Sequence, residues 1–218
     1  MEKRPAVFLD RDGVINPLIY HRDHGIVDSP FTLRQFSVLP DVPCAIRLLN
    51  DLGFVVLIAS NQPGIAKGHF EPELIPKIER KMRTTFRPAG ARLDATYYCL
   101  HHPEATRKKY RSNCDCRKPA PGLLIQAAKD LNLSLPDSYM IGDGLTDVEA
   151  GNAAGCATIF IGRWKPEYEQ FVTPSDLRPD FVAKDLLEAA ELIQTNTTSM
   201  NQKASRSGAA KLPQVVLQ

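Results

Sequence analysis

Residues 6–14, Ala-Val-Phe-Leu-Asp-Arg-Asp-Gly-Val, contain the pattern that decides the fold. Their first four side chains form an apolar run of the kind that a buried strand of a parallel sheet requires. Asp10 and Asp12 follow the run directly, and Gly13 allows the backbone to turn tightly beside a ligand. Because ligands of such sheets bind beyond the carboxyl ends of the strands, we expect both aspartates to lie at a reaction site.

Strand-like and helix-like segments alternate along the rest of the chain. We expect strands at 54–59, 96–100, 138–143, 157–162 and 180–182, the last two at sheet edges, and helices at 41–52, 71–86, 121–131, 147–154 and 186–193. This alternation predicts an α/β fold with a doubly wound parallel sheet and right-handed connections. We expect one domain over residues 1–194, with residues 17–40 as a long loop over the active face. The segment 195–218 is polar and lacks acidic residues, so we expect a disordered tail there.

The composition indicates a protein that acts on a small molecule. Its 218 residues, 43% of them hydrophobic, can form one good core, and a formal net charge of +2 is too small to indicate nucleic acid or an anionic membrane as a partner. No apolar run reaches the roughly 18 residues of a membrane span, and residues 1–4 lead into the first strand without a secretory segment. We therefore expect a cytoplasmic protein that works as a monomer.

Three later motifs stand in the same kind of position as the aspartate pair. Ser60 and Asn61 end the second apolar run, Lys118 precedes a helix-like segment, and Asp143 ends a further strand-like run. Each motif alone could be an ordinary turn. In this order and in these contexts, together with residues 8–16, they resemble the four motifs of the haloacid dehalogenase-like phosphohydrolases, and the resemblance spans residues 5–190.

This resemblance implies hydrolysis of phosphate esters through an aspartyl-phosphate. Asp10 would be the nucleophile, and Asp12 would give a proton to the leaving group and later take one from the attacking water. Asp10, the backbone carbonyl of Asp12 and Asp143 would hold Mg²⁺, because oxygen ligands and a phosphate favour this hard cation.

The remaining motif residues are expected to contact the phosphate. The hydroxyl of Ser60 and the side chain of Asn61 can donate to its oxygens, and Lys118 adds a positive charge. Asp147 follows Asp143 by four residues, and we expect it to lie outside the metal-ligand set or to serve as an acid at a helix start.

A phospho-acceptor module is the alternative from another functional class. Receiver-like domains also combine a strand-end aspartate, Mg²⁺, a hydroxyl side chain and a lysine on a doubly wound sheet. Asp12 favours the phosphatase, because an acid or base two residues from the nucleophile promotes turnover of an aspartyl-phosphate.

Three of the five cysteines cluster with a histidine. Cys99, His101, Cys114 and Cys116 form two pairs that are separated by twelve residues, and this set suits tetrahedral zinc in a reducing compartment. The competing interpretations are three reduced thiols with a surface histidine, or a site in which His102 is the ligand. With four protein ligands the zinc would be structural, and it would order the basic loop at 99–118.

The two remaining cysteines lie outside this motif. We expect Cys44 and Cys156 to be small core residues.

The cysteine motif also narrows the resemblance. Together with Arg117 and Lys118 it looks like the zinc loop of the capless D-glycero-D-manno-heptose 1,7-bisphosphate phosphatases and the related histidinol-phosphate phosphatases. Arg117 matches an arginine that reaches substrate phosphate in those enzymes. Gly144 departs from the lysine that is common in the heptose enzymes, which leaves the substrate open. The resemblance implies removal of the 7-phosphate from a heptose 1,7-bisphosphate, with histidinol phosphate as the alternative substrate.

Overall fold

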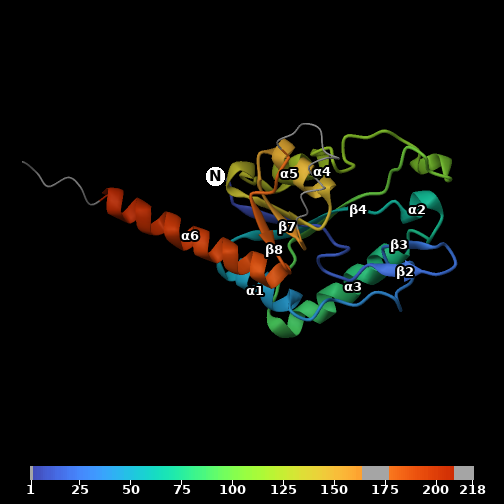
Figure 1. Ribbon diagram of the computed structural model, residues 1–218, viewed down its shortest axis with the longest axis horizontal. Coiled ribbons are helices and arrows are strands. Elements are labelled where there is room, and N and C mark those ends of the chain that lie inside the picture. Colours follow the sequence, from blue (N-terminus) through green and yellow to red (C-terminus); the bar gives the residue numbers. More distant parts are fainter. Residues whose placement is uncertain (1, 164–176, 209–218) are drawn as a thin grey trace, which may run out of the picture.

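The computed structural model describes residues 2–163 and 177–208, with side chains up to residue 198. Six parallel strands form the main sheet in the order β5-β4-β1-β6-β7-β8. Figure 1 labels β4, β7 and β8 of this sheet. The strands are β1 (Ala6–Leu9), β4 (Val55–Asn61), β5 (Ala95–Cys99), β6 (Tyr139–Gly142), β7 (Ala157–Ile161) and β8 (Phe181–Ala183). The predicted doubly wound α/β fold is confirmed.

Strand β1 lies in the middle of the sheet and all four of its residues are buried. It pairs with β4 on one side and with β6 on the other. From β1 the chain builds outward through β4 and β5, and then returns to the other side for β6, β7 and β8. The strand order therefore reverses at β1, and a ligand crevice is expected beyond its carboxyl end.

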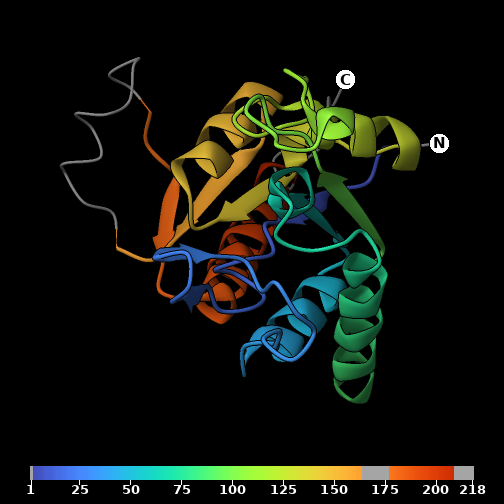
Figure 2. The same cartoon turned by 90° about the vertical axis from the view of Figure 1, so that its right-hand side faces the viewer.

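Helices cover both faces of the sheet (Figure 2). On one face, α1 (Val42–Asp51), α3 (Leu74–Phe86) and α6 (Leu186–Gly208) pack on a core that includes Val7 and Leu9 of β1. On the other face, α4 (Gly122–Leu131) packs on Ala6 and Phe8, and α5 (Leu145–Ala154) packs beside it. This alternation along β1 is what a strand that is buried on both faces requires.

The sequence-based boundaries agree with these elements to within a few residues, with one difference in the sheet. Strand β7 was expected at an edge, but it pairs with both β6 and β8 and is therefore internal. The edges are β5 and β8.

The segment 17–40 contains structure that the sequence did not reveal. Strands β2 (Ile19–His21) and β3 (Ile26–Asp28) form an antiparallel hairpin. Three-residue strands are too short to show a clear alternation of apolar and polar residues. The hairpin lies beyond the same end of the sheet as the short helix α2 (Gly64–Lys67) and the loop that contains the 3₁₀ helix η2 (Lys108–Tyr110) (Figure 1).

The closing helix is longer than predicted. We expected it to end at residue 193 and the chain to be disordered from residue 195, but α6 continues to Gly208. No glycine or proline interrupts the segment 194–207, and the hydroxyls of Thr195, Thr197 and Thr198 donate to carbonyls four residues earlier. Residues 209–218 of the predicted tail lie outside the described residues. Within the described part of the chain, no helix is long and apolar enough to cross a membrane.

The two isolated cysteines differ from each other. Cys156 is buried, as predicted, but Cys44 is exposed. Helix α1 turns Val42, Ala45 and Ile46 toward the core, so a residue at position 44 points away from it.

Candidate active site

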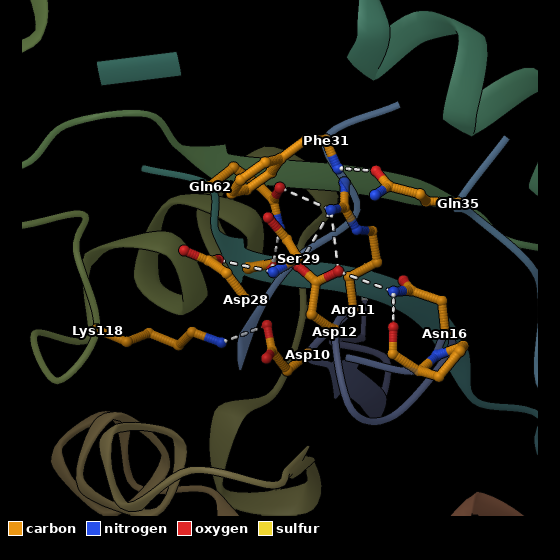
Figure 3. A network of polar contacts seen from close by, with 12 residues as sticks. Asp10, Arg11, Asp12, Asn16, Asp28, Ser29, Phe31, Gln35, Gln62 and Lys118 are labelled. Carbon is orange, nitrogen blue, oxygen red and sulfur yellow. Dashed lines mark hydrogen bonds and ion pairs between the residues drawn. The ribbon is translucent and has the colours of Figure 1, made fainter. Parts of the chain in front are cut away.

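The predicted motif residues meet at the carboxyl ends of the three central strands. Asp10 follows β1, Ser60 and Asn61 are the last residues of β4, and Asp143 follows β6. The amide of Asp10 donates to the carbonyl of Ile141 at 2.9 Å, which ties the end of β1 to β6. Lys118 arrives from the loop before α4, and its side chain points at Asp10 (Figure 3).

Lys118 is buried and neutralises two carboxylates. Its Nζ lies 2.9 Å from Asp10 Oδ1 and 2.5 Å from Asp147 Oδ1, and it donates to the carbonyl of Ala59 at 2.7 Å. Burial alone would lower the pKa of Lys118, but the charges of Asp10 and Asp147 outweigh burial and raise it. The ammonium group therefore stays charged and holds Asp10 in one orientation.

Asn61 aligns the backbone of Lys118. Its Nδ2 donates to the carbonyl of Lys118 at 2.9 Å, and its Oδ1 accepts from the amide of Lys118 at 3.0 Å. One amide hydrogen of Asn61 remains for a phosphate oxygen. Ser60 is buried, and its Oγ accepts from Gln62 at 3.1 Å, which leaves the hydroxyl hydrogen free to donate. The predicted phosphate contacts of both residues stay predictions.

Three acids form what we call the carboxylate cluster: Asp10, Asp143 and Asp147. One oxygen from each lies within 4.8 Å of the others. Burial raises the pKa of Asp143 to about 7, and the charges of Asp10 and Asp147 add to this effect. Burial also raises the pKa of Asp147, to about 6, although Lys118 opposes it. Closely spaced oxygen donors with a costly excess of negative charge fit a hard divalent cation such as Mg²⁺.

Gly13 makes this packing possible. Its φ is +85°, and a Cβ atom at this position would lie 1.9 Å from Oδ2 of Asp143. A side chain here would displace the Asp143 carboxylate and would strain the backbone.

Both carboxylate oxygens of Asp147 have partners. Its Oδ1 pairs with Lys118, and its Oδ2 accepts from the amide of Gly144 at 3.1 Å. These contacts agree with the prediction that Asp147 lies at a helix start.

Asp12 has a separate set of partners, which sequence reasoning missed (Figure 3). Its carboxylate accepts from Arg11 Nη2 at 3.0 Å, from Asn16 Nδ2 at 2.9 Å and from Gln62 Nε2 at 2.6 Å. Arg11 and Asn16 belong to the motif that was already identified, and Gln62 follows Asn61 directly. Nothing in their residue types alone indicated that they converge on Asp12.

The predicted zinc ligands form a compact Cys₃His cluster: Cys99, His101, Cys114 and Cys116. The Sγ atoms of the cysteines are 3.1 to 3.6 Å apart, and Nδ1 of His101 lies 3.5 Å from Sγ of Cys116. Tetrahedral zinc with bonds of about 2.3 Å requires sulfur atoms separated by roughly 3.8 Å, so the cluster is close to the geometry of a structural zinc site. Burial, reinforced by the other two thiols, raises the pKa of Cys116, so zinc binding must displace protons.

Two further residues lie next to this cluster in the sequence: His102, the competing zinc ligand, and Arg117, the expected phosphate contact. The Nδ1 of His102 accepts from the amide of Glu104 at 3.1 Å, and His102 is not part of the cluster. Arg117 follows Cys116 directly, and its Nη1 donates to the carbonyl of His101 at 3.3 Å. The guanidinium group of Arg117 is thus tied to the loop, and its contact with substrate phosphate stays a prediction.

Comparisons with known proteins agree on one family. A family model described as "HAD-hyrolase-like" matches residues 115–189. D-glycero-beta-D-manno-heptose-1,7-bisphosphate 7-phosphatase of Photorhabdus laumondii is 39% identical over 74% of this chain and 82% of the relative. The protein of the same name from Escherichia coli K12 is 35% identical over 87% of this chain and 94% of the relative.

A solved structure supports the same assignment. The D,D-heptose 1,7-bisphosphate phosphatase from B. bronchiseptica, complexed with magnesium and phosphate, has a TM-score of 0.71 and 28% identity. The match covers 88% of this chain and 99% of that one. This chain therefore belongs to the D-glycero-beta-D-manno-heptose-1,7-bisphosphate 7-phosphatase family of haloacid dehalogenase-like phosphatases.

Proposed function

We propose that this protein is a Mg²⁺-dependent phosphatase that converts D-glycero-beta-D-manno-heptose 1,7-bisphosphate to the heptose 1-phosphate and inorganic phosphate. One observation carries the proposal. Relatives of this name match over more than four fifths of their length, and the motif residues Asp10, Lys118 and Asp143 meet at one end of the sheet.

In the first step Asp10 attacks the phosphorus atom of the 7-phosphate. The new bond joins a carboxylate oxygen of Asp10 to phosphorus, and the bond from phosphorus to the sugar oxygen breaks. Asp12 gives its proton to that oxygen, so the sugar leaves as an alcohol. Lys118 supports this step because its ammonium group orients Asp10 and offsets the negative charge that gathers around the phosphoryl group.

In the second step the aspartyl-phosphate is hydrolysed. Asp12, now ionised, takes a proton from the attacking water as the water oxygen bonds to phosphorus, and the oxygen–phosphorus bond at Asp10 breaks to release phosphate and the Asp10 carboxylate. The same carboxyl group thus serves as acid and then as base, which requires it to keep one orientation through the cycle.

Two acids of the carboxylate cluster and one backbone carbonyl are the proposed metal ligands. Asp10 and Asp143, with the backbone carbonyl of Asp12, would hold Mg²⁺, while Asp147 keeps Lys118 in place. Bound Mg²⁺ offsets the charge on the nucleophile and on the phosphoryl oxygens. The relative whose structure is described with magnesium and phosphate supports this assignment.

We assign the phosphate to Ser60, Asn61 and Lys118, and a second contact to Arg117 on the zinc loop. One chain supplies every residue that this assignment uses, so we expect a monomer to be sufficient. Three thiols that suit zinc, together with a sugar phosphate substrate, favour the cytoplasm.

A substrate panel tests the proposal. Initial rates are measured with heptose 1,7-bisphosphate and histidinol phosphate, each with Mg²⁺ and, after gel filtration into Mg²⁺-free buffer, without it. We expect the heptose bisphosphate to have the higher kcat/KM and its turnover to require Mg²⁺. A much higher kcat/KM for histidinol phosphate would refute the substrate, and release of only one equivalent of phosphate would indicate a phospho-acceptor module instead.

A further inference from the structure

Asp12 and Asp10 are two residues apart, yet among the residues that the structure describes their side chains share no hydrogen-bond partner. Asp10 pairs with Lys118, whereas Asp12 accepts hydrogen bonds from Arg11, Asn16 and Gln62 (Figure 3). Substituting the partners of Asp12 should therefore change the acid and base without changing the nucleophile. This separation makes the role of each partner measurable.

The orientation of Gln62 follows from its neighbours. An arginine has only donors, so the side-chain oxygen of Gln62 must face Arg11, at 2.7 Å. The amide nitrogen then faces the other way and donates to Asp12 at 2.6 Å and to Ser60 at 3.1 Å. Gln62 has 0% of its surface exposed, and both of its amide hydrogens are used. It therefore has no free hydrogen for a substrate.

Arg11 sets this orientation at an energetic cost. Its side chain is fully buried, and Nη2 alone serves both Asp12 and Gln62. Among the described residues Nε and Nη1 have no hydrogen-bond partner, and the ring of Tyr98 lies 5.9 Å from the guanidinium carbon. A buried guanidinium with unpartnered nitrogens weakens a folded protein. Its contacts with Asp12 and Gln62 indicate that Arg11 serves the active site and not the stability of the core.

We propose that Gln62, oriented by Arg11, is a positioning residue for the acid and base Asp12. The donors of Gln62 and Asn16 act on different oxygens of the carboxylate and so prevent its rotation. They also stabilise the negative charge that appears on Asp12 when its proton goes to the leaving oxygen. The inference rests on the proposed phosphatase function, and it adds a residue that acts on proton transfer through Asp12.

Gln62→Met tests this role, because methionine keeps the length of the side chain and removes the donor. A sugar alcohol needs a proton to leave, whereas p-nitrophenolate leaves without one. With heptose bisphosphate we expect kcat to fall about 10- to 100-fold, a part of what acid–base catalysis supplies, while KM stays within about threefold. With p-nitrophenyl phosphate in a stopped-flow instrument, the first burst of p-nitrophenolate should keep its rate within about threefold.

Gln126→Met, on the exposed surface of α4, is the matched control and should leave both rates unchanged. Arg11→Met is the second variant, and it should produce the same split between the two substrates. An equal loss in the sugar turnover and in the p-nitrophenolate burst would refute the positioning role, and so would an unchanged kcat in Gln62→Met. Absence of turnover in the wild-type protein with every phosphate monoester would instead refute the phosphatase function.

Discussion

The carboxylate cluster and the Cys₃His cluster are both built for a cation, but they differ in how the chain assembles them. The carboxylate cluster joins Asp10 to Asp143 and Asp147 across the sheet, and a buried lysine keeps it partly neutral. The Cys₃His cluster comes from the end of β5 and one loop, and it provides all four ligands of a closed site. The first cluster is suited to chemistry and the second to holding a loop in place.

The two clusters are nevertheless joined by three consecutive residues. Cys116 belongs to the Cys₃His cluster, Arg117 follows it, and Lys118 reaches into the carboxylate cluster. A disturbance at the Cys₃His cluster should therefore reach Asp10 through the backbone, whereas a disturbance at Asp10 should leave the loop intact. Four predictions test this difference.

The largest effect is expected from Asp10→Asn. The substitution removes the proposed nucleophile and one carboxylate, so we expect kcat to fall by at least about 10⁴-fold, comparable to the loss of other catalytic nucleophiles. Phosphate release is the measurement, together with mass spectrometry of acid-quenched protein. The zinc content should remain unchanged. Substantial turnover in this variant would overturn the proposed mechanism.

Lys118→Met should have the next largest effect. We expect kcat to fall about 10²- to 10³-fold, and unfolding in urea should show a loss of about 3–5 kcal/mol, because Asp10 and Asp147 are left without their buried partner. Adding Asp147→Asn to this variant should restore part of the stability and none of the activity. Lys129→Met, at an exposed position of α4, is the control for a lost lysine. Normal stability of the Lys118→Met variant would contradict a stabilising role for the buried contacts of Lys118 with Asp10 and Asp147.

Cys116→Ser tests whether a change at the Cys₃His cluster reaches the carboxylate cluster. A displacement of about 1 Å at Arg117 and Lys118 can lower the rate roughly 100-fold, so we expect kcat/KM to fall by about that factor. Limited proteolysis should cut within residues 100–117 while the α/β core stays folded. Cys44→Ser, at an exposed position on α1, should change neither. Zinc-free purified protein with near-normal kinetics in Cys116→Ser would show that the core alone holds the loop.

The smallest effect concerns pH and Mg²⁺. The pKa of Asp143 is raised to about 7, so the folded protein without Mg²⁺ binds more protons than the unfolded chain between about pH 4 and 7. This group therefore lowers stability as the pH rises through that window, and Mg²⁺ should reverse the loss. We expect saturating Mg²⁺ to raise Tm by about 5–10 °C at pH 8 and by less than half of that at pH 6.

Asp143→Asn is the control for this measurement, because it removes the titrating group and a proposed metal ligand together. Zinc is kept saturating so that only the carboxylate cluster responds. An equal rise of Tm at both pH values in the wild-type protein would mean that Asp143 does not control cation binding.

The amino-acid sequence by itself determined the parts that depend on short stretches of chain. Apolar runs and their spacing predicted the α/β fold, since each run is buried wherever its strand lies in the sheet. The rule that ligands bind beyond strand ends then placed Asp10, Asn61 and Asp143 together. The Cys₃His cluster was also predictable, because its ligands come in two close pairs whose chemistry suits zinc.

Only the tertiary structure decided which polar groups pair with one another. Gln62 reaches Asp12 across 50 residues of sequence and also binds Arg11. Asn61 pairs with the backbone of Lys118 across 57 residues. The β2–β3 hairpin and the full length of α6 were likewise missed. Hydrogen bonds depend on distances of a few tenths of an ångström between groups that separate elements bring together. A residue type records that a group can donate or accept, but packing decides which partner it reaches.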